Sequence, residues 1–148
     1  MLPPAWQLRL VDLNVRPLAD DDIIDHAALQ AKLETPICLD ECIRNAHVAG
    51  QAIRLGACRI INIKPGRVSG MDEAKKIHDL CAENQIPVWH GGMLESGIGR
   101  AHNLHIASLP NFKLPSDLSA SKRYYKEDLI DPPIELQRDG TIRVPKGL

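Results

Sequence analysis

The 148-residue sequence predicts an α/β fold built from parallel strands, on the strength of two observations. Short apolar stretches typical of strands recur roughly every 25 residues, and segments with the apolar spacing of helices lie between them. Parallel neighbours need a crossover connection of about a dozen residues or more, and these intervals leave room for one. We therefore expect repeated strand-helix units around one core.

Five stretches are the expected strands, and a tail of different character follows them. The strands cover residues 10–15, 35–40, 59–64, 86–94 and 111–115. The acidic stretch after the first strand predicts the start of a helix. Apolar residues at steps of three and four predict helices over 42–57 and 72–84, and Gly56 closes the first of these. Residues 124–148 contain a Pro-Pro pair and an Asp-Gly turn, which predict a closing segment with a small hairpin.

Two apolar stripes are the expected buried faces of these helices. The stripe of the first helix consists of Ile43, Ala46, Gly50 and Ile53, and that of the second consists of Ala74, Ile77 and Cys81.

Charge and composition narrow the class of protein. Eighteen basic and nineteen acidic residues leave a net charge of −1, which favours neither nucleic acid nor an anionic membrane surface as a partner. No apolar stretch approaches the roughly 20 residues of a membrane span, and the first residues lack the apolar core of a signal peptide. Four cysteines without metal or secreted spacing favour a reducing cytoplasm, with Cys38 and Cys58 as buried thiols.

The alternation of side chains along two strands brings two charged residues together. In the strand at 35–40 the aliphatic side chains face away from Asp40, and in the strand at 59–64 they face away from Asn62 and Lys64. In a parallel barrel the aliphatic face meets the helices, so Asp40 and Lys64 would lie at the C-terminal mouth, where barrel active sites occur. A flavodoxin-like open sheet also accepts five strands, but its two covered faces would house the polar pair less readily.

Four separated motifs resemble one known family of enzymes. They are "TPICLDECI", "INIKPGRVSG", "WHGGMLESGIGRAHNLHIASLPNF" and "DLIDPPIELQRDGTIRVP". In this order they resemble the C-terminal half of o-succinylbenzoate synthases and N-acylamino acid racemases, in the muconate-lactonizing branch of the enolase superfamily. The resemblance implies a partial (β/α) TIM-type barrel, about the last five strands of a (β/α)7β barrel. It divides the chain into a non-family segment at 1–16, the partial barrel at 17–122 and a capping tail at 123–148.

The resemblance also implies a chemistry. Enzymes of this family hold one Mg²⁺ with three carboxylates and place two lysines on opposite sides of a small carboxylate substrate. A lysine moves the proton α to the carboxylate, which leads to racemisation or, in the synthase of menaquinone biosynthesis, to dehydration. Asp40 matches the third metal carboxylate and Lys64 matches the second lysine. Asn62 and Glu95 are the candidate substrate contacts.

The sequence departs from the family pattern at Val15. The preceding family strand ends in "IEQPL", whose glutamate binds the metal, whereas this chain reads "NVRPL" and contains no Lys-x-Lys pair. We therefore expect a truncated or frameshifted relative that binds Mg²⁺ poorly and is not active alone. The alternative is a non-catalytic remnant or an interaction module, whose open strand edges pair with a second copy or a complementing chain.

Other spacings suggest weaker alternatives. His102 and His105, spaced i, i+3 on a helix expected after "GIGR", could form a metal pair, but we expect them to pack against the barrel wall. Cys38, Cys42 and His47 lack a fourth ligand for zinc. The stretch "KPGRVSG" is typical of an anion-binding turn before a helix, although the resemblance assigns it to the substrate pocket.

Overall fold

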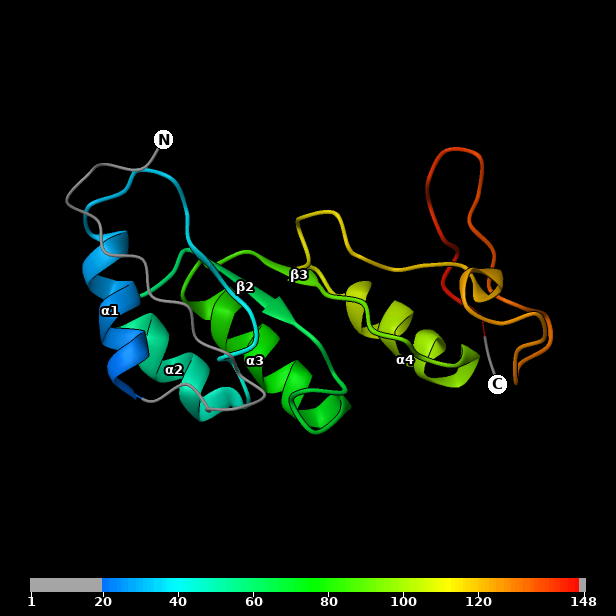
Figure 1. Ribbon diagram of the computed structural model, residues 1–148, viewed down its shortest axis with the longest axis horizontal. Coiled ribbons are helices and arrows are strands. Elements are labelled where there is room, and N and C mark those ends of the chain that lie inside the picture. Colours follow the sequence, from blue (N-terminus) through cyan, green and yellow to red (C-terminus); the bar gives the residue numbers. More distant parts are fainter. Residues whose placement is uncertain (1–19, 147–148) are drawn as a thin grey trace.

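A computed structural model of the chain describes residues 20–146 (Figure 1). Its centre is a parallel three-stranded sheet in the order β1-β2-β3, formed by Cys38–Leu39, Ile60–Ile63 and Val88–His90. Each neighbouring pair of strands is parallel and is joined by a helix, as the spacing of the apolar stretches predicted. The parallel α/β architecture is therefore confirmed. The strand expected at residues 10–15, which ends at Val15, lies outside the described residues.

The strand expected at residues 111–115 is reduced to a single parallel bridge between Phe112 and Val88. The amides of Val88 and Lys113 still make ladder hydrogen bonds on either side of this bridge, at 3.2 Å each. Pro115 follows, and because proline has no backbone N–H the ladder is interrupted there. It resumes only where the Asp117 amide donates to the carbonyl of His90 at 2.8 Å.

Four α-helices and one 3₁₀ turn complete the described chain. They are α1 (Asp20–Gln30), α2 (Ala46–Arg54), α3 (Met71–Glu83), α4 (Gly97–Ala107) and η1 (Ser121–Arg123). The helix predicted over 42–57 starts later than expected because the side chain of Asn45 caps it, accepting from the Val48 amide at 2.9 Å. Gly56 ends it with φ of +65°, as predicted. No helix within residues 20–146 is long and apolar enough to cross a membrane.

The helices follow one another in a row across the molecule, from α1 to α4, and the tail lies beyond α4 (Figure 1). The predicted stripe of α3 is fully buried at Ala74, Ile77 and Cys81. Of the stripe predicted for α2, Ile43 and Gly50 are buried as expected, whereas Ala46 and Ile53 are only half-buried. Ala49 and Ala52 are fully buried as well, so the buried face of α2 is turned partly away from the predicted one, and the small side chains at these two positions allow α2 to pack closely.

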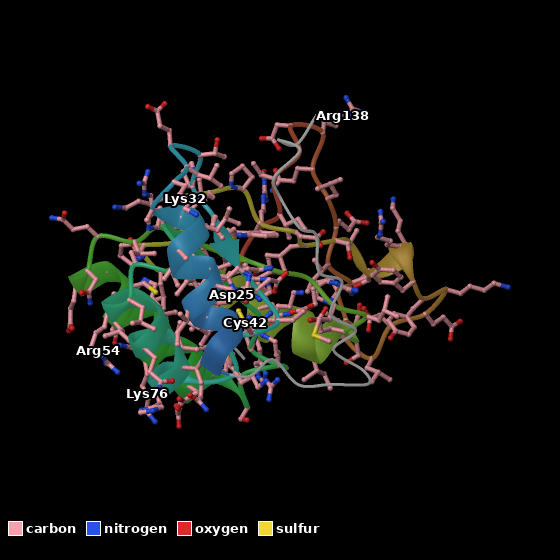
Figure 2. The ribbon with its side chains drawn as sticks, turned by 60° about the vertical axis from the view of Figure 1, so that its left-hand side comes forward. Asp25, Lys32, Cys42, Arg54, Lys76 and Arg138 are labelled. Carbon is pink, nitrogen blue, oxygen red and sulfur yellow. The ribbon has the colours of Figure 1, made fainter. Side chains whose placement is uncertain are left out.

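The tail folds back on itself after α4. An antiparallel bridge joins Leu136 and Ile142 across the Asp-Gly turn, where Gly140 has φ of +82°. The tip of this turn carries the exposed Arg138, which projects away from the helices (Figure 2). Closer to α4, the amide of Ser121 donates to the carbonyl of Ile134 at 2.8 Å, which closes the tail into a compact unit.

Candidate functional site

The two charged residues singled out from the sequence meet at one end of the sheet. Asp40 directly follows β1 and Lys64 directly follows β2, so both emerge from the C-terminal ends of neighbouring parallel strands. The ammonium nitrogen of Lys64 lies 3.1 Å from a carboxylate oxygen of Asp40. The predicted convergence of Asp40 and Lys64 is confirmed, and it follows from the two-residue period of side chains along each strand.

Two further charged residues complete this cluster, and the sequence analysis assigned no role to either. Glu41 accepts a hydrogen bond from Lys64 Nζ at 2.7 Å and pairs with Arg67 Nη1 at 2.7 Å. Arg67 also contacts Asp40 through Nη1 and donates from Nη2 to the carbonyl of Asn62 at 2.6 Å. The turn "KPGRVSG" therefore contributes the Arg67 side chain, which pairs with two carboxylates of the chain itself, whereas an anion bound by the backbone of this turn stays a prediction. The sequence feature that could have indicated a role for Arg67 is a basic residue in the turn directly after Lys64.

The charges of the cluster shift the pKa values of Lys64 and Asp40. Burial alone would lower the pKa of Lys64, but hydrogen bonds to Glu41 and Asp40 outweigh it and raise the pKa above the usual lysine value. Burial likewise acts to raise the pKa of Asp40, and its polar neighbours Glu41, Lys64 and Arg67 lower it overall. At neutral pH the pair is an ammonium and a carboxylate. Lys64 can therefore deliver a proton as it stands, and it becomes a base only when another cation competes for the carboxylates.

Comparison with known proteins decides the lineage of this site. Residues 16–148 match the Enolase C-terminal domain-like family. The chain belongs to this family. It is 60% identical to the o-succinylbenzoate synthase of Geobacillus kaustophilus over 132 residues, which are 89% of this chain and 35% of that protein. It is 53% identical to the N-succinylamino acid racemase of an Amycolatopsis species, again over 132 residues and with the same 89% and 35% coverage. The chain thus spans about a third of the length of these relatives.

Solved structures of the superfamily show the same arrangement of elements. An enolase superfamily member from Enterococcus faecalis V583 superposes with a TM-score of 0.81 at 53% identity, over 89% of this chain and 36% of that one. The dipeptide epimerase from Cytophaga hutchinsonii, whose structure contains Mg and the dipeptide D-Ala-L-Val, superposes with a TM-score of 0.76 at 26% identity, over 87% and 35%. The partial enolase-type barrel predicted from the motifs is therefore confirmed.

The family chemistry implies a Mg²⁺ site, and the described residues supply only part of one. Mg²⁺ needs about six oxygen ligands, of which carboxylates usually provide one or more. Asp40 is one such carboxylate at the strand end, with Glu41 beside it. Within residues 20–146 no group of three or more His, Cys, Asp or Glu side chains converges as metal ligands. Asp40 fits as a single ligand of a larger set.

Asn62 lies on the same side of β2 as Lys64, as predicted, but it is covered. Its side chain is 1% exposed, and neither its amide oxygen nor its amide nitrogen has a hydrogen-bond partner among the described residues. A Cβ atom on Gly91 would come within 2.5 Å of this amide and within 2.6 Å of Lys64 Cε. Only glycine permits this approach of the β3–α4 turn. Contact between Asn62 and a substrate stays a prediction, and it requires this cover to move.

Glu95 lies apart from the charged cluster, in the turn between β3 and α4. Its carboxylate oxygens accept from the Met93 amide at 3.1 Å and 3.0 Å, and one of them accepts from Asn103 Nδ2 at 2.8 Å. With Pro65 and His102, among others, it lines a cavity of about 560 Å³ beside the turn that follows Lys64. A direct substrate contact by Glu95 stays a prediction, but its hydrogen bonds hold its own turn.

The histidines of α4 do not lie where the sequence analysis expected. His102 and His105 are both exposed and do not pack against the barrel wall. The inward face of α4 is formed instead by Asn103, Leu104 and Ile106, which are at most 4% exposed. Spacing along the helix predicted that the histidines share a side, but only packing decided which side faces the barrel.

The cysteines likewise differ from expectation at one position. Cys38 is exposed, and its sulfur accepts from Trp89 Nε1 at 3.2 Å. Cys42 is buried, and Figure 2 places it behind α1 in the interior, whereas His47 is exposed. These three residues do not form a metal site. Cys58 is buried as expected, and its burial raises its pKa to about 12.

Proposed function

We propose that this chain forms part of the catalytic barrel of an enzyme of the o-succinylbenzoate synthase and N-succinylamino acid racemase type. The reaction is the movement of a proton on the carbon next to a carboxylate of a small substrate, followed by dehydration or by return of the proton to the other face. The observation that carries the proposal is the contact between Lys64 and Asp40 at the C-terminal ends of β1 and β2. The high identity to enzymes with these two names supports it.

The residues of this chain have distinct roles in the proposal. Lys64 holds and transfers the proton, and Asp40 provides one ligand to Mg²⁺. Glu41 and Arg67 hold the side chains of Lys64 and Asp40 in place before the metal binds. Mg²⁺, when bound, stabilises the negative charge that develops on the substrate carboxylate. Asn62 and Glu95 shape the surroundings of Lys64.

The described chain supplies one lysine and one strand-end carboxylate, and the proposed chemistry needs more of both. Within residues 20–146 β1 is an edge strand with no neighbour on its outer side, and further strands of a barrel could add there. We propose that these strands come from a complementing chain or a second copy, and that this chain alone is inactive. Its four free cysteines fit a cytoplasmic location.

A non-catalytic remnant or interaction module is the second candidate. The observation that favours it is the mutual neutralisation of Lys64, Asp40, Glu41 and Arg67, which satisfies the charges of the cluster without a metal. Such a chain would keep the open β1 edge for association and would have lost the reaction.

Complementation distinguishes the two candidates. Dehydration of the cyclohexadiene precursor and racemisation of N-succinylamino acids are measured with Mg²⁺, for the chain alone and mixed with the N-terminal two thirds of the Geobacillus kaustophilus synthase. The C-terminal third of that synthase is the positive control. We expect activity only in the mixture, with a loss of roughly 10²-fold or more in Lys64→Ala. Lys76→Ala, at an exposed site on α3 (Figure 2), is the matched control and should keep the activity.

An inactive mixture, in the presence of an active positive control, would contradict the catalytic proposal and support the remnant. Calorimetry with Mg²⁺ gives a second readout that does not depend on turnover. We expect the chain alone to give no saturable binding heat, because one paired carboxylate makes a poor site, and the mixture to bind Mg²⁺.

A further inference from the structure

We propose that Glu95 is a positioning residue, which together with Asn103 holds the turn at residues 91–94 against the side chain of Lys64. The inference deepens the proposed function and rests on it for the role of Lys64. It assigns to Glu95 a task in which the carboxylate acts through the turn, in place of the direct substrate contact predicted from the sequence.

The carboxylate of Glu95 is anchored on one side and holds the turn on the other. Asn103, which is 3% exposed on the inner face of α4, donates to Glu95 Oε1 at 2.8 Å. Both carboxylate oxygens accept from the amide of Met93, at 3.1 Å and 3.0 Å. The carbonyl of Glu95 also accepts from Nη2 of Arg100, which is 1% exposed, at 3.0 Å. Because both anchors are buried residues of a helix, the turn is tied to a rigid element.

The other end of the turn forms a wall beside Lys64. The amide of Gly91 donates to the carbonyl of Ile63, the residue before Lys64, at 3.1 Å. A Cβ on Gly91 would lie 2.6 Å from Lys64 Cε, and a Cβ on Gly92 would lie 2.0 Å from the carbonyl oxygen of Asp117. The glycine pair is therefore pressed between the lysine and the following segment. The position of Gly91 and Gly92 beside Lys64 therefore depends on how the other end of the turn, at Met93, is held.

A direct substrate contact fits Glu95 less well than positioning does. Its hydrogen bonds to Met93 and Asn103 already occupy the carboxylate. A second carboxylate on a substrate would be repelled by it, since like charges at close range disfavour each other. A carboxylate that accepts from a backbone amide and a buried side-chain amide serves as a clamp.

The test uses the full chain and needs no turnover. Glu95→Ala removes the clamp, and Glu95→Gln keeps an oxygen that accepts from Met93, while the Asn103 amide can rotate to pair with the new amide. In Glu95→Ala we expect amide exchange at Met93 and Gly91 to become about 10-fold faster or more, as for a locally opened turn. The nuclear Overhauser contact between Gly91 Hα and Lys64 Hε should disappear. In Glu95→Gln both signals should stay close to wild type.

Controls separate positioning from a general loss of structure. The amide of Ile86, which donates to the Cys81 carbonyl at 2.9 Å at the end of α3, should exchange at the wild-type rate in all variants. Glu83→Ala, at an exposed glutamate of α3, should leave the turn unchanged. Should Glu95→Ala fail to fold, Asn103→Ala breaks the clamp from the helix side and predicts the same loss of the Gly91–Lys64 contact.

Two outcomes would overturn the inference. One is a Gly91–Lys64 contact that persists in Glu95→Ala, which would mean that the clamp does not place the turn. The other is an equal loss in Glu95→Gln and Glu95→Ala, which would mean that the negative charge acts directly. Because the readouts are structural, an inactive complementation mixture would contradict the proposed function without bearing on the clamp, and either of these outcomes in an active mixture would contradict the clamp alone.

Discussion

A buried ion pair between Arg100 and Asp128 joins the tail to α4. Arg100 lies in α4 and Asp128 in the tail, and their side chains are 1% and 2% exposed. Arg100 Nη1 lies 3.3 Å from Asp128 Oδ2, while Asp128 Oδ1 accepts from the Gly97 amide at 2.6 Å and from the Leu129 amide at 2.7 Å. The perturbation is a double-mutant cycle of Asp128→Asn and Arg100→Met.

The two single variants should differ, because each leaves a different group behind. Asp128→Asn leaves the buried Arg100 guanidinium without a counter-charge, and we expect a loss of about 3 kcal/mol, the lower end for a broken buried pair. Arg100→Met leaves a carboxylate that still accepts from the Gly97 and Leu129 amides, so we expect a smaller loss of about 1.5 kcal/mol. The double variant buries no charge, and its loss should be no larger than about 1.5 kcal/mol. The coupling energy is then about 3 kcal/mol in magnitude.

Urea unfolding followed by circular dichroism measures these differences, and limited proteolysis around residue 128 reports detachment of the tail. The matched control is the exposed pair of Lys75 and Asp79 on α3, whose side chains are 60% and 46% exposed and whose coupling should be below about 1 kcal/mol. Single-variant losses that add within about 0.5 kcal/mol in the double variant would refute the reasoning, since the two residues would then not interact.

Three further predictions concern the site and its surroundings. Glu41→Gln should lower the pKa of Lys64, because the hydrogen bond to Glu41 helps to raise it; titration of the lysine ε-carbon by NMR measures this, and an unchanged or higher midpoint would contradict it. Asn62→Leu should raise the free energy of unfolding by about 1–3 kcal/mol, because it removes a buried amide that has no hydrogen-bond partner among residues 20–146, and destabilisation in urea would contradict this. Burial lowers the pKa of His90 below the usual 6.5. Below pH 6.5 the folded state therefore binds fewer protons than the unfolded state, and the free energy of unfolding decreases as the pH falls from 6.5 toward the folded-state pKa. Urea unfolding between pH 5 and 8 should show this loss, with a slope of at most about 1.4 kcal/mol per pH unit, and the same slope in His90→Leu would assign it to another group.

The residues of the site show which contacts a local sequence pattern could predict and which it could not. Asp40 and Lys64 could be predicted to meet because two parallel strands with a two-residue side-chain period present their ends on one face. Glu95 was predicted to contact the substrate from the resemblance to the enzyme family. In the structure its carboxylate accepts hydrogen bonds from Met93 and Asn103. A motif identifies a residue in the chain, but the hydrogen bonds around it decide whether its carboxylate is available.

The sequence by itself determined the order of strands and helices, the parallel sheet and the buried face of α3, because these depend on periodicity and on connection length. It also determined the family, through separated motifs in a consistent order. Only the tertiary structure decided that Arg67 joins the carboxylates of Asp40 and Glu41, that His102 faces outward, and that Asp128 reaches Arg100. These contacts join residues 26 to 28 positions apart, or depend on how a helix is rotated, and such choices are made by close packing of the whole chain and not by any local repeat.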